Sequence, residues 1–449
     1  RTAQTFSDAR FGPTNVGDLQ SINGILNGMS WVQPFEAEFG PDGSLYVIDF
    51  GEGTGSGRGG SNEGAGIYRI DYVAAGRPPT AKIGTDKDSG PAPLAVTFSS
   101  AGSTAGDNSA LTYAWDFTND GTTDSTAANP SHTYTSTGSF TAKLTVRNTG
   151  NGLTSTATTT VVVGNTRPTV TITVPDGGFS DFGDKIPYTV TVTDPEDSTI
   201  DCSRVSVQTQ LGHDAHAHPL DVYPGCSGVL STEADAGDGH GPGQNLYTVV
   251  TAQYPDGGGA GGVPALVGST RAQLQAKSKE AEHFTSQSGV AVFDRSAARA
   301  GKRLGDIDHN DWIAFSPVSL KNIGSVTVGA SSGGLGGDVE FRAGSPTGTL
   351  LGKATIGSTG SYDNVVSPTV TLSNKPTGTF TLYVKFVNAN QGASTQDLLA
   401  LDWLRFNGAG VKQEPGGTLS ATATPATGTA PLAVAFAATT TVGTGQTIS

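Results

Sequence analysis

Positive charge, methionine and long apolar runs are scarce in this sequence. Its 449 residues include 26 lysines and arginines against 40 aspartates and glutamates, which gives a net charge of −14. Nucleic acid and anionic membrane are themselves negative, so neither is expected as a partner. No apolar run approaches the roughly 20 residues that cross a bilayer, so membrane insertion is not expected. A single methionine, 63 glycines and only 15% charged residues are instead typical of a β-rich, secreted, extracellular protein.

Cysteine is nearly absent as well. The chain has two, Cys202 and Cys226, and both fall inside one expected domain. In an oxidising compartment we expect them to form a disulfide, which would stabilise that domain by ~3 kcal/mol. The alternative is a pair of free buried thiols, the usual state in a reducing compartment.

Residues 380–386 have the most regular pattern of apolar residues in the sequence, and this pattern has no helical period. Apolar positions there alternate with Thr381, Tyr383 and Lys385, which is the period of a strand with one face in a core. We therefore expect an all-β fold. The 449 residues exceed what one core normally serves, so three or four domains are expected.

A series of short motifs spans residues 280–406. They are Asp308-His-Asn-Asp-Trp-Ile313, Val339-Glu-Phe-Arg342, Ser345-Pro-Thr-Gly348, Ser358-Thr-Gly-Ser-Tyr-Asp363 and Leu401-Asp-Trp-Leu-Arg-Phe406. In order and spacing these motifs resemble a family 6 carbohydrate-binding module, which implies a lectin-like jelly-roll β-sandwich over residues 276–408. Trp312 and Trp403 stand at framework positions of that family, so we expect both in the core.

The first expected strand of this domain, residues 280–284, carries two acidic side chains. Glu280 and Glu282 are two residues apart, so on a strand both carboxylates project from the same face. Oxygen ligands on one face suit a hard cation such as calcium. The resemblance implies a structural calcium held by the matching positions, which are Glu280, Glu282 and Asp402. A solvated acidic edge is the alternative.

The sugar site of the family is only partly matched. Such modules clamp a sugar ring between two aromatic faces beside an asparagine, because a pyranose offers C–H faces for stacking and hydroxyls at its rim. Tyr362 stands at the second aromatic position, but Asp306 stands at the first and Ala400 replaces the asparagine. The candidate sugar-binding residues are therefore Tyr362, Asp306 and His309. Binding in a concave-face cleft, and no sugar binding at all, remain open.

Residues 1–77 contain two segments with strand patterns, 39–49 and 66–72, around a glycine-rich loop. They resemble the last blade of a β-propeller of the glucose/sorbosone dehydrogenase type, a family that uses pyrroloquinoline quinone (PQQ). The catalytic histidine and the quinone and calcium ligands of that family lie in earlier blades. No dehydrogenase activity is therefore expected of this chain, whose parent protein would be the candidate PQQ-type sugar dehydrogenase.

Residues 78–164 carry the motif Tyr113-Ala-Trp-Asp-Phe117 followed by Leu144-Thr-Val146. They resemble a PKD-type domain, an immunoglobulin-like sandwich, and the three aromatic residues of the first motif share a strand face that should enter the core. The segment 90–98, Gly-Pro-Ala-Pro-Leu-Ala-Val-Thr-Phe, recurs at 428–436 with two substitutions. Residues 414–449 are therefore expected to begin a second PKD-type domain, and the chain is expected to be a piece of a longer modular protein.

Alternating strands from residue 167 onward predict an immunoglobulin-like domain over residues 165–275. It contains His213-Asp-Ala-His-Ala-His218 and, further on, His240. His216 and His218 face the same way on an extended strand, and imidazoles so placed suit zinc or copper. The candidate ligands are His213, His216, His218 and His240, closed by Asp214, Asp221 or water. The alternative is a polar surface loop whose histidines bond to backbone and water.

These observations favour an all-β chain of tandem immunoglobulin-like and PKD-type sandwiches plus a lectin-like jelly roll. No catalytic residues are expected. The expected function is a non-catalytic carbohydrate-binding and spacer region of a secreted multimodular protein, which targets a parent enzyme to polysaccharide. One alternative is a structural or adhesive cell-surface protein whose sandwiches self-associate. Another is a metalloenzyme centred on the histidine cluster.

Overall fold

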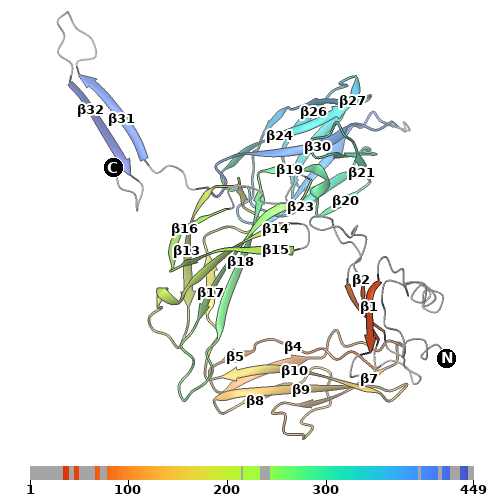
Figure 1. Cartoon of the computed structure of the whole chain (residues 1–449), viewed down its shortest axis with the longest axis vertical. Coiled ribbons are helices and arrows are strands. Elements are labelled where there is room, and N and C mark those ends of the chain that lie inside the picture. The colour runs from red at the N-terminus through yellow and green to blue at the C-terminus, as the bar shows by residue number, and fades with distance from the viewer. Residues whose placement is uncertain are drawn as a thin grey trace, which may run out of the picture. The chain divides into compact units, whose positions relative to one another are not determined.

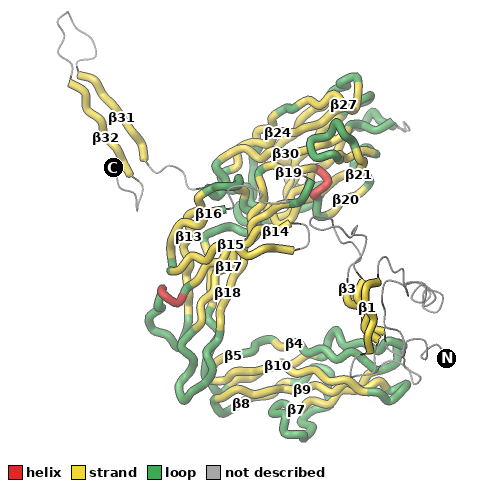
Figure 2. Tube along the Cα trace, in the orientation of Figure 1, coloured by secondary structure: helices red, strands yellow, loops and turns green. Residues whose placement is uncertain are grey.

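The regular secondary structure of the computed structural model is almost all β-strand, as expected (Figure 1). Helix among the described residues is confined to the short 3-10 segments η1 (Cys202–Arg204) and η2 (Ala281–His283), which are red in Figure 2. Among the residues described, no helix is long and apolar enough to cross a membrane. Two compact units are formed, one by residues 1–166 with 258–265 and one by residues 167–257 with 266–449. The structure describes residues 34–39, 45–49, 66–70, 78–213, 216–232, 243–392, 396–412, 417–424 and 435–442.

Two small sheets lie near the ends of the sequence. Strands β1 (Pro34–Phe39), β2 (Leu45–Asp49) and β3 (Gly66–Ile70) form an antiparallel sheet in the order β1-β2-β3. β2 and β3 fall in the two segments with strand patterns, and β1 is an additional strand. Strands β31 (Gly417–Thr424) and β32 (Ala435–Val442) pair antiparallel, and the second copy of the sequence repeat ends inside β32.

The domain expected at residues 78–164 is a sandwich of two sheets, β5-β10-β9-β7 and β4-β6-β8. Trp115 and Phe117 lie in its core with Phe98, and Tyr113 packs against that core, as the shared strand face predicts. The strands are β4 (Gly84–Thr85), β5 (Ser89–Gly90), β6 (Leu94–Ser99), β7 (Leu111–Asp116), β8 (Ser131–Tyr134), β9 (Gly138–Asn148) and β10 (Thr154–Val163).

The immunoglobulin-like domain pairs a sheet β11-β13-β16 with a sheet β12-β18-β17-β14-β15. Cys202 and Cys226 form the expected disulfide, with Cα atoms 5.1 Å apart, and so tie η1 to the turn before β16. The strands are β11 (Thr169–Ile172), β12 (Phe179–Ser180), β13 (Lys185–Thr193), β14 (Ser206–His213), β15 (His216–Pro224), β16 (Ser227–Ser231), β17 (Leu246–Pro255) and β18 (Val267–Ala276).

The last large sandwich, which we call the module, encloses the largest core of the chain between two sheets. One sheet has the order β21-β22-β30-β24-β27, with β19 paired to β30 and β28 to β24; the other has the order β20-β23-β29-β25-β26. The strands are β19 (Ser278–Glu280), β20 (Ser286–Ser288), β21 (Ala291–Asp294), β22 (Lys302–Gly305), β23 (Trp312–Val318), β24 (Ile323–Ser332), β25 (Gly337–Ala343), β26 (Thr349–Ile356), β27 (Ser361–Val366), β28 (Thr369–Thr371), β29 (Phe380–Val387) and β30 (Ala400–Gly408).

The immunoglobulin-like domain and the module exchange apolar side chains where they meet, a region we call the seam. Phe179 comes from β12 of the immunoglobulin-like domain but belongs to the core of the module, where its ring stacks on Phe406 at 4.1 Å between centroids. Val411 follows the last strand of the module and belongs to the core of the immunoglobulin-like domain. The Val411 N–H also donates to the Phe179 carbonyl at 2.9 Å. Each core is therefore completed by a residue from the other domain.

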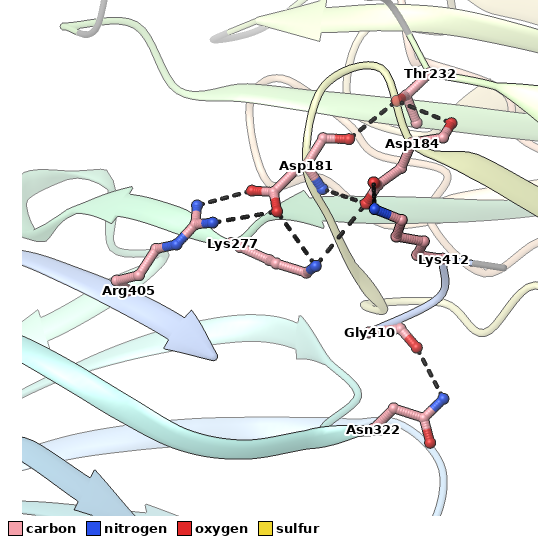
Figure 3. Close-up of polar contacts among 8 residues, drawn as sticks. All are labelled: Asp181, Asp184, Thr232, Lys277, Asn322, Arg405, Gly410 and Lys412. Carbon is pink, nitrogen blue, oxygen red and sulfur yellow. Dashed lines mark hydrogen bonds and ion pairs between the residues drawn. The ribbon is translucent and has the colours of Figure 1, made fainter. Parts of the chain in front are cut away.

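A charged network covers the same seam (Figure 3). Arg405 donates two hydrogen bonds to the Asp181 carboxylate, at 2.7 and 3.1 Å. The buried Lys277 ammonium lies 3.3 Å from Asp181 and 3.9 Å from Asp184, and Lys412 lies 3.5 Å from Asp184. Burial opposes the ionised form of Asp181, but the hydrogen bonds and charges of Arg405 and Lys277 outweigh it and lower the pKa of that carboxyl.

Candidate functional site

A row of aromatic and charged side chains crosses the outer face of the sheet β20-β23-β29-β25-β26. Trp312 on β23 lies opposite Lys385 on β29, and Lys385 lies opposite Glu340 on β25. Directly opposed residues of antiparallel strands share a face of the sheet. The alternate residues of these strands are core residues, so the row faces away from the core. We call Trp312, Lys385 and Glu340 the sheet-face row.

The next positions along the strands extend this surface. Tyr383 lies beside the row, and its ring meets the Trp312 ring edge-on with centroids 5.1 Å apart. Arg342, opposite Tyr383, donates from Nε to a Glu340 oxygen at 2.7 Å. Glu340 is therefore both buried and paired, which fixes its carboxylate. Aromatic faces and hydrogen-bonding groups are thus carried on strands rather than on loops.

The expectation that Trp312 and Trp403 lie in the core is wrong. Both are partly exposed and absent from the core of the module, which reaches the neighbouring residues Ile313 and Leu404 instead. Trp403 lies flat on Gly329, where a Cβ atom would come within 2.3 Å of the indole, and the Arg299 guanidinium stands 4.9 Å above it. Strand alternation places each indole on the outer face of its sheet.

The residues predicted to bind sugar gather around the described parts of one stretch, residues 388–392 and 396–397. The Tyr362 hydroxyl donates to the Asp397 carbonyl at 2.9 Å, and the Asp306 N–H donates to the Asp397 carboxylate at 2.9 Å. The His309 N–H donates to the Gln391 side chain at 2.6 Å. The structure therefore brings Tyr362, Asp306 and His309 to one group of loops. Gly333 leaves room for the Tyr362 ring, because a Cβ atom there would lie 2.6 Å from it.

The electrostatics of these loops are acidic. Burial raises the pKa of Asp397, and the nearby charges of Asp306 and Asp308 raise it further. Burial also raises the pKa of the Tyr362 hydroxyl. The Phe293 ring lies on the same side of Gly305 as Asp397, because a Cβ atom at Gly305 would come within 2.9 Å of the ring and 3.6 Å of the Asp397 carboxylate. Sequence patterns did not mark Phe293, because it sits on a short strand with no motif around it.

The prediction of a strand at residues 280–284 is wrong beyond its first residue. β19 ends at Glu280, and Ala281 to His283 form the 3-10 turn η2. Lys279, Glu280 and Ala281 are all buried. Three consecutive buried side chains cannot belong to a strand with one exposed face, so the chain turns at this point.

The turn nevertheless keeps three carboxylates together. Glu280 accepts hydrogen bonds from the Arg299 guanidinium, one of them at 2.8 Å from Nε, and Asp402 accepts from the Arg299 backbone N–H at 3.1 and 3.2 Å. One oxygen of Glu280 and both oxygens of Glu282 are buried and accept no hydrogen bond from any described residue. Burial, together with the charges of Glu280 and Asp402, raises the pKa of Glu282 to about 7.

Buried carboxylate oxygens without donors fit a cation. Burial also raises the pKa values of Glu280 and Asp402, although the hydrogen bonds and charge of Arg299 act in the opposite direction at both groups. In the part of the chain that the structure describes, no three Asp, Glu, His or Cys side chains already converge tightly enough to enclose a metal ion. The donor set of Glu280, Glu282 and Asp402 matches the oxygen chemistry of calcium.

Two of the four predicted histidine ligands meet in the structure. His213 ends β14 and His218 lies on β15, with their Nε2 atoms 3.1 Å apart. His216 starts β15 and lies opposite His213 in the strand register. His240 lies outside the described residues. Asp221 is used elsewhere, because its carboxylate accepts a hydrogen bond from the Tyr223 hydroxyl at 3.2 Å.

Two parts of the chain match models of known families. Residues 280–408 match the model described as carbohydrate binding module (family 6), and residues 76–163 match the model described as PKD domain. The two sandwich domains are thus assigned to these modular classes, neither of which is catalytic. The first match supports a polysaccharide-binding role for the module.

Similarity to individual proteins concentrates in the module. An arabinoxylan arabinofuranohydrolase from Paenibacillus polymyxa is 30% identical over 131 residues, which are 28% of this chain and 20% of that protein. The chain therefore covers about a fifth of the length of this curated relative. Among solved structures, a β-1,3-glucan-binding family 6 module from Bacillus halodurans is 29% identical, covering 29% of this chain and 94% of its own, with a TM-score of 0.27. A family 6 module from Clostridium cellulolyticum in complex with xylose is 27% identical, covering 29% and 95%, with a TM-score of 0.26.

Proposed function

We propose that the module binds polysaccharide through the sheet-face row, and that the chain is the non-catalytic binding and spacer region of a secreted multimodular protein. The observation that carries this proposal is the alignment of Trp312, Lys385 and Glu340 in one register across three strands. An indole can stack on the C–H face of a pyranose, while the ammonium and carboxylate can hydrogen-bond to its rim hydroxyls.

The rigidity of this face favours binding. Glu340 is held by Arg342, and all the side chains of the row stand on hydrogen-bonded strands. Because little side-chain freedom remains to be lost, a sugar that fits the face would bind with a small ordering cost. A site carried on strands is also more precise than one carried on loops.

The loop group around Tyr362 is the second candidate surface. Its hydrogen bond to Asp397 and its contact with Gly333 hold the ring in one orientation, as a stacking platform requires. Asp306 and His309 would supply polar contacts at its rim. This surface has only one of the two aromatic residues of the family's clamp, because Asp306 stands at the first aromatic position, so we rank it below the sheet-face row.

Paired substitutions in the full chain test both surfaces. Glycan-array screening and calorimetry would include arabinoxylan, the substrate named for the curated relative. We expect Trp312→Ala to weaken binding about tenfold or more, equivalent to roughly 1.4 kcal/mol, and Tyr362→Ala to leave it nearly unchanged. The opposite result would transfer the site to the loops. Unchanged binding in both variants, or no glycan bound by the wild type, would reject the proposal.

We also propose that Glu280, Glu282 and Asp402 hold a structural calcium ion. Support comes from the three buried carboxylate oxygens that accept no hydrogen bond from described residues. A bound cation would supply the missing partners and stabilise the folded module, because the unfolded chain has no such site. Adding excess chelator should therefore lower the melting temperature of the wild type but not that of Glu282→Gln. Equal chelator effects in both proteins would remove the claim.

The proposal of a secreted multimodular protein includes its compartment and the activity of its parent. The disulfide between Cys202 and Cys226 suits an oxidising compartment. The antiparallel sheet of β1, β2 and β3 is compatible with part of a propeller blade, so we retain the parent as a PQQ-type sugar dehydrogenase. Assaying the parent protein for quinone-dependent sugar oxidation tests this part.

The adhesive alternative predicts concentration-dependent self-association, which sedimentation would detect without any glycan.

A further inference from the structure

The two imidazoles of His213 and His218 face each other across the strand pair β14 and β15. Their Nε2 atoms are 3.1 Å apart, the ring centroids are 5.2 Å apart, and the ring planes differ by 19°. His213 is buried and His218 is exposed. The pair therefore has one side in the protein and one side in solvent.

Strand register fixes this pair in place. β14 lies between β15 and β17, and His213 pairs with Leu246 on the β17 side. Gly212 just before it lies under the Tyr247 ring, and a Cβ atom at Gly212 would come within 2.0 Å of that ring. His213 is therefore held within three paired strands, and the residue before it has to be small to leave room for the Tyr247 ring.

The separation of the nitrogens is close to that of two ligands on one metal ion. Two nitrogens about 2.0–2.1 Å from a tetrahedral zinc lie roughly 3.3–3.4 Å apart, so the two imidazoles would have to separate by a few tenths of an ångström and turn until both Nε2 lone pairs point at the ion. At 3.1 Å the two nitrogens can alternatively share one proton, if one ring donates and the other accepts. Both arrangements require neutral imidazole at one position or both.

We propose that His213 and His218 form a binding site for a late first-row divalent cation, zinc or copper, with water in the remaining positions. Imidazole suits both metals, and the exposed side of the pair leaves room for water. The module's carboxylates are a separate site with oxygen ligands, which suit calcium instead. The proposal rests on His213 and His218 alone and does not need His216 or His240.

Metal titration of the full chain tests the proposal. With excess calcium present to occupy the carboxylates, we expect about one equivalent of Zn²⁺ or Cu²⁺ to bind. Replacing either imidazole, in His213→Gln or His218→Gln, should weaken that binding about tenfold or more, whereas His132→Gln in the PKD-type domain should not. The copper form should show an electron paramagnetic resonance signal with coupling to two nitrogens, and His218→Gln should reduce it to one.

Three results would overturn the proposal. The first is the absence of stoichiometric binding by the wild type, which would leave the pair as a direct hydrogen bond between imidazoles. The second is unchanged affinity in both variants, which would place the ion elsewhere. The third is equal loss in His132→Gln, which would indicate scattered surface binding.

Discussion

Replacing Phe179 with alanine should destabilise the module, although Phe179 belongs by sequence to the preceding domain. Its side chain is 1% exposed and stacks on Phe406 inside the module's core. Truncation would leave a cavity there. Buried phenylalanine-to-alanine changes cost about 3–5 kcal/mol, from the lost burial and the cavity together. A domain is typically stable by only about 5–15 kcal/mol, so this loss is a large part of the total.

We expect the melting transitions of the module and of the immunoglobulin-like domain to shift together. For a unit of about 150–250 residues, each kcal/mol lowers the melting temperature by roughly 2–4 °C, so a drop of about 6–20 °C is expected. Because Val411 from the module also completes the core of the immunoglobulin-like domain, both domains should shift together. Differential scanning calorimetry of the full chain would measure this, with hydrogen exchange to locate the loss.

A matched control comes from the PKD-type core. Phe117 is equally buried there, so Phe117→Ala should lower a transition of that domain and leave the joint transition in place. The reasoning would be refuted if Phe179→Ala left protection of the module strands unchanged. A shortened chain covering residues 280–408 should likewise be less stable than one covering 167–412, because the shorter chain lacks Phe179.

Two further predictions concern buried ionisable groups of the module. Ionisation of Glu282, whose pKa is raised to about 7, opposes folding of the metal-free protein, so in chelator its melting temperature should fall as the pH rises from about 4.5 through 7. The Glu282→Gln variant should lack this slope, and a slope of the opposite sign would contradict the burial assignment. Burial lowers the pKa of Lys279 to about 8, and its ammonium forms no ion pair with any described residue, only a 2.9 Å hydrogen bond to Asn245. Lys279→Met should therefore raise the melting temperature at pH 7, and this gain should shrink as the pH rises from about 8 toward 10.5. The same substitution at the exposed Lys353 should give no such gain. A lower melting temperature for Lys279→Met would show that the hydrogen bond to Asn245 outweighs the burial penalty.

The alternation of apolar and polar residues predicted where strands form, but not which strands pair with each other. The pattern of residues 380–386 correctly placed Tyr383 and Lys385 on the face opposite the core. It could not show that β23 and β25 flank this strand, and therefore could not align Trp312 or Glu340 with Lys385. Register between strands far apart in sequence depends on the tertiary fold, which a period of two does not encode.

The histidine pair shows a similar limit. Spacing on one strand suggested His216 and His218 as partners, because residues two apart share a face. The structure instead brings His213 of β14 to His218 of β15. His218 lies opposite Leu211 in the register, so it stands diagonally across from His213, at a distance that long side chains can bridge; the spacing along one strand does not show this cross-strand register.

The seam was the hardest feature to predict, because the sequence around Phe179 indicates a surface turn. Phe179 lies in the sequence Asp176-Gly-Gly-Phe-Ser-Asp-Phe-Gly-Asp184, where glycines and aspartates indicate a surface turn. Nothing in that pattern shows that the ring fills a core built mainly from residues 281–406. The same turn supplies Asp181 and Asp184 to the charged network of the module's Lys277, Arg405 and Lys412. Apolar exchange and ion pairing at one place resist both separation and rotation, so the immunoglobulin-like domain should hold the proposed sugar-binding face in place instead of serving as a loose tether.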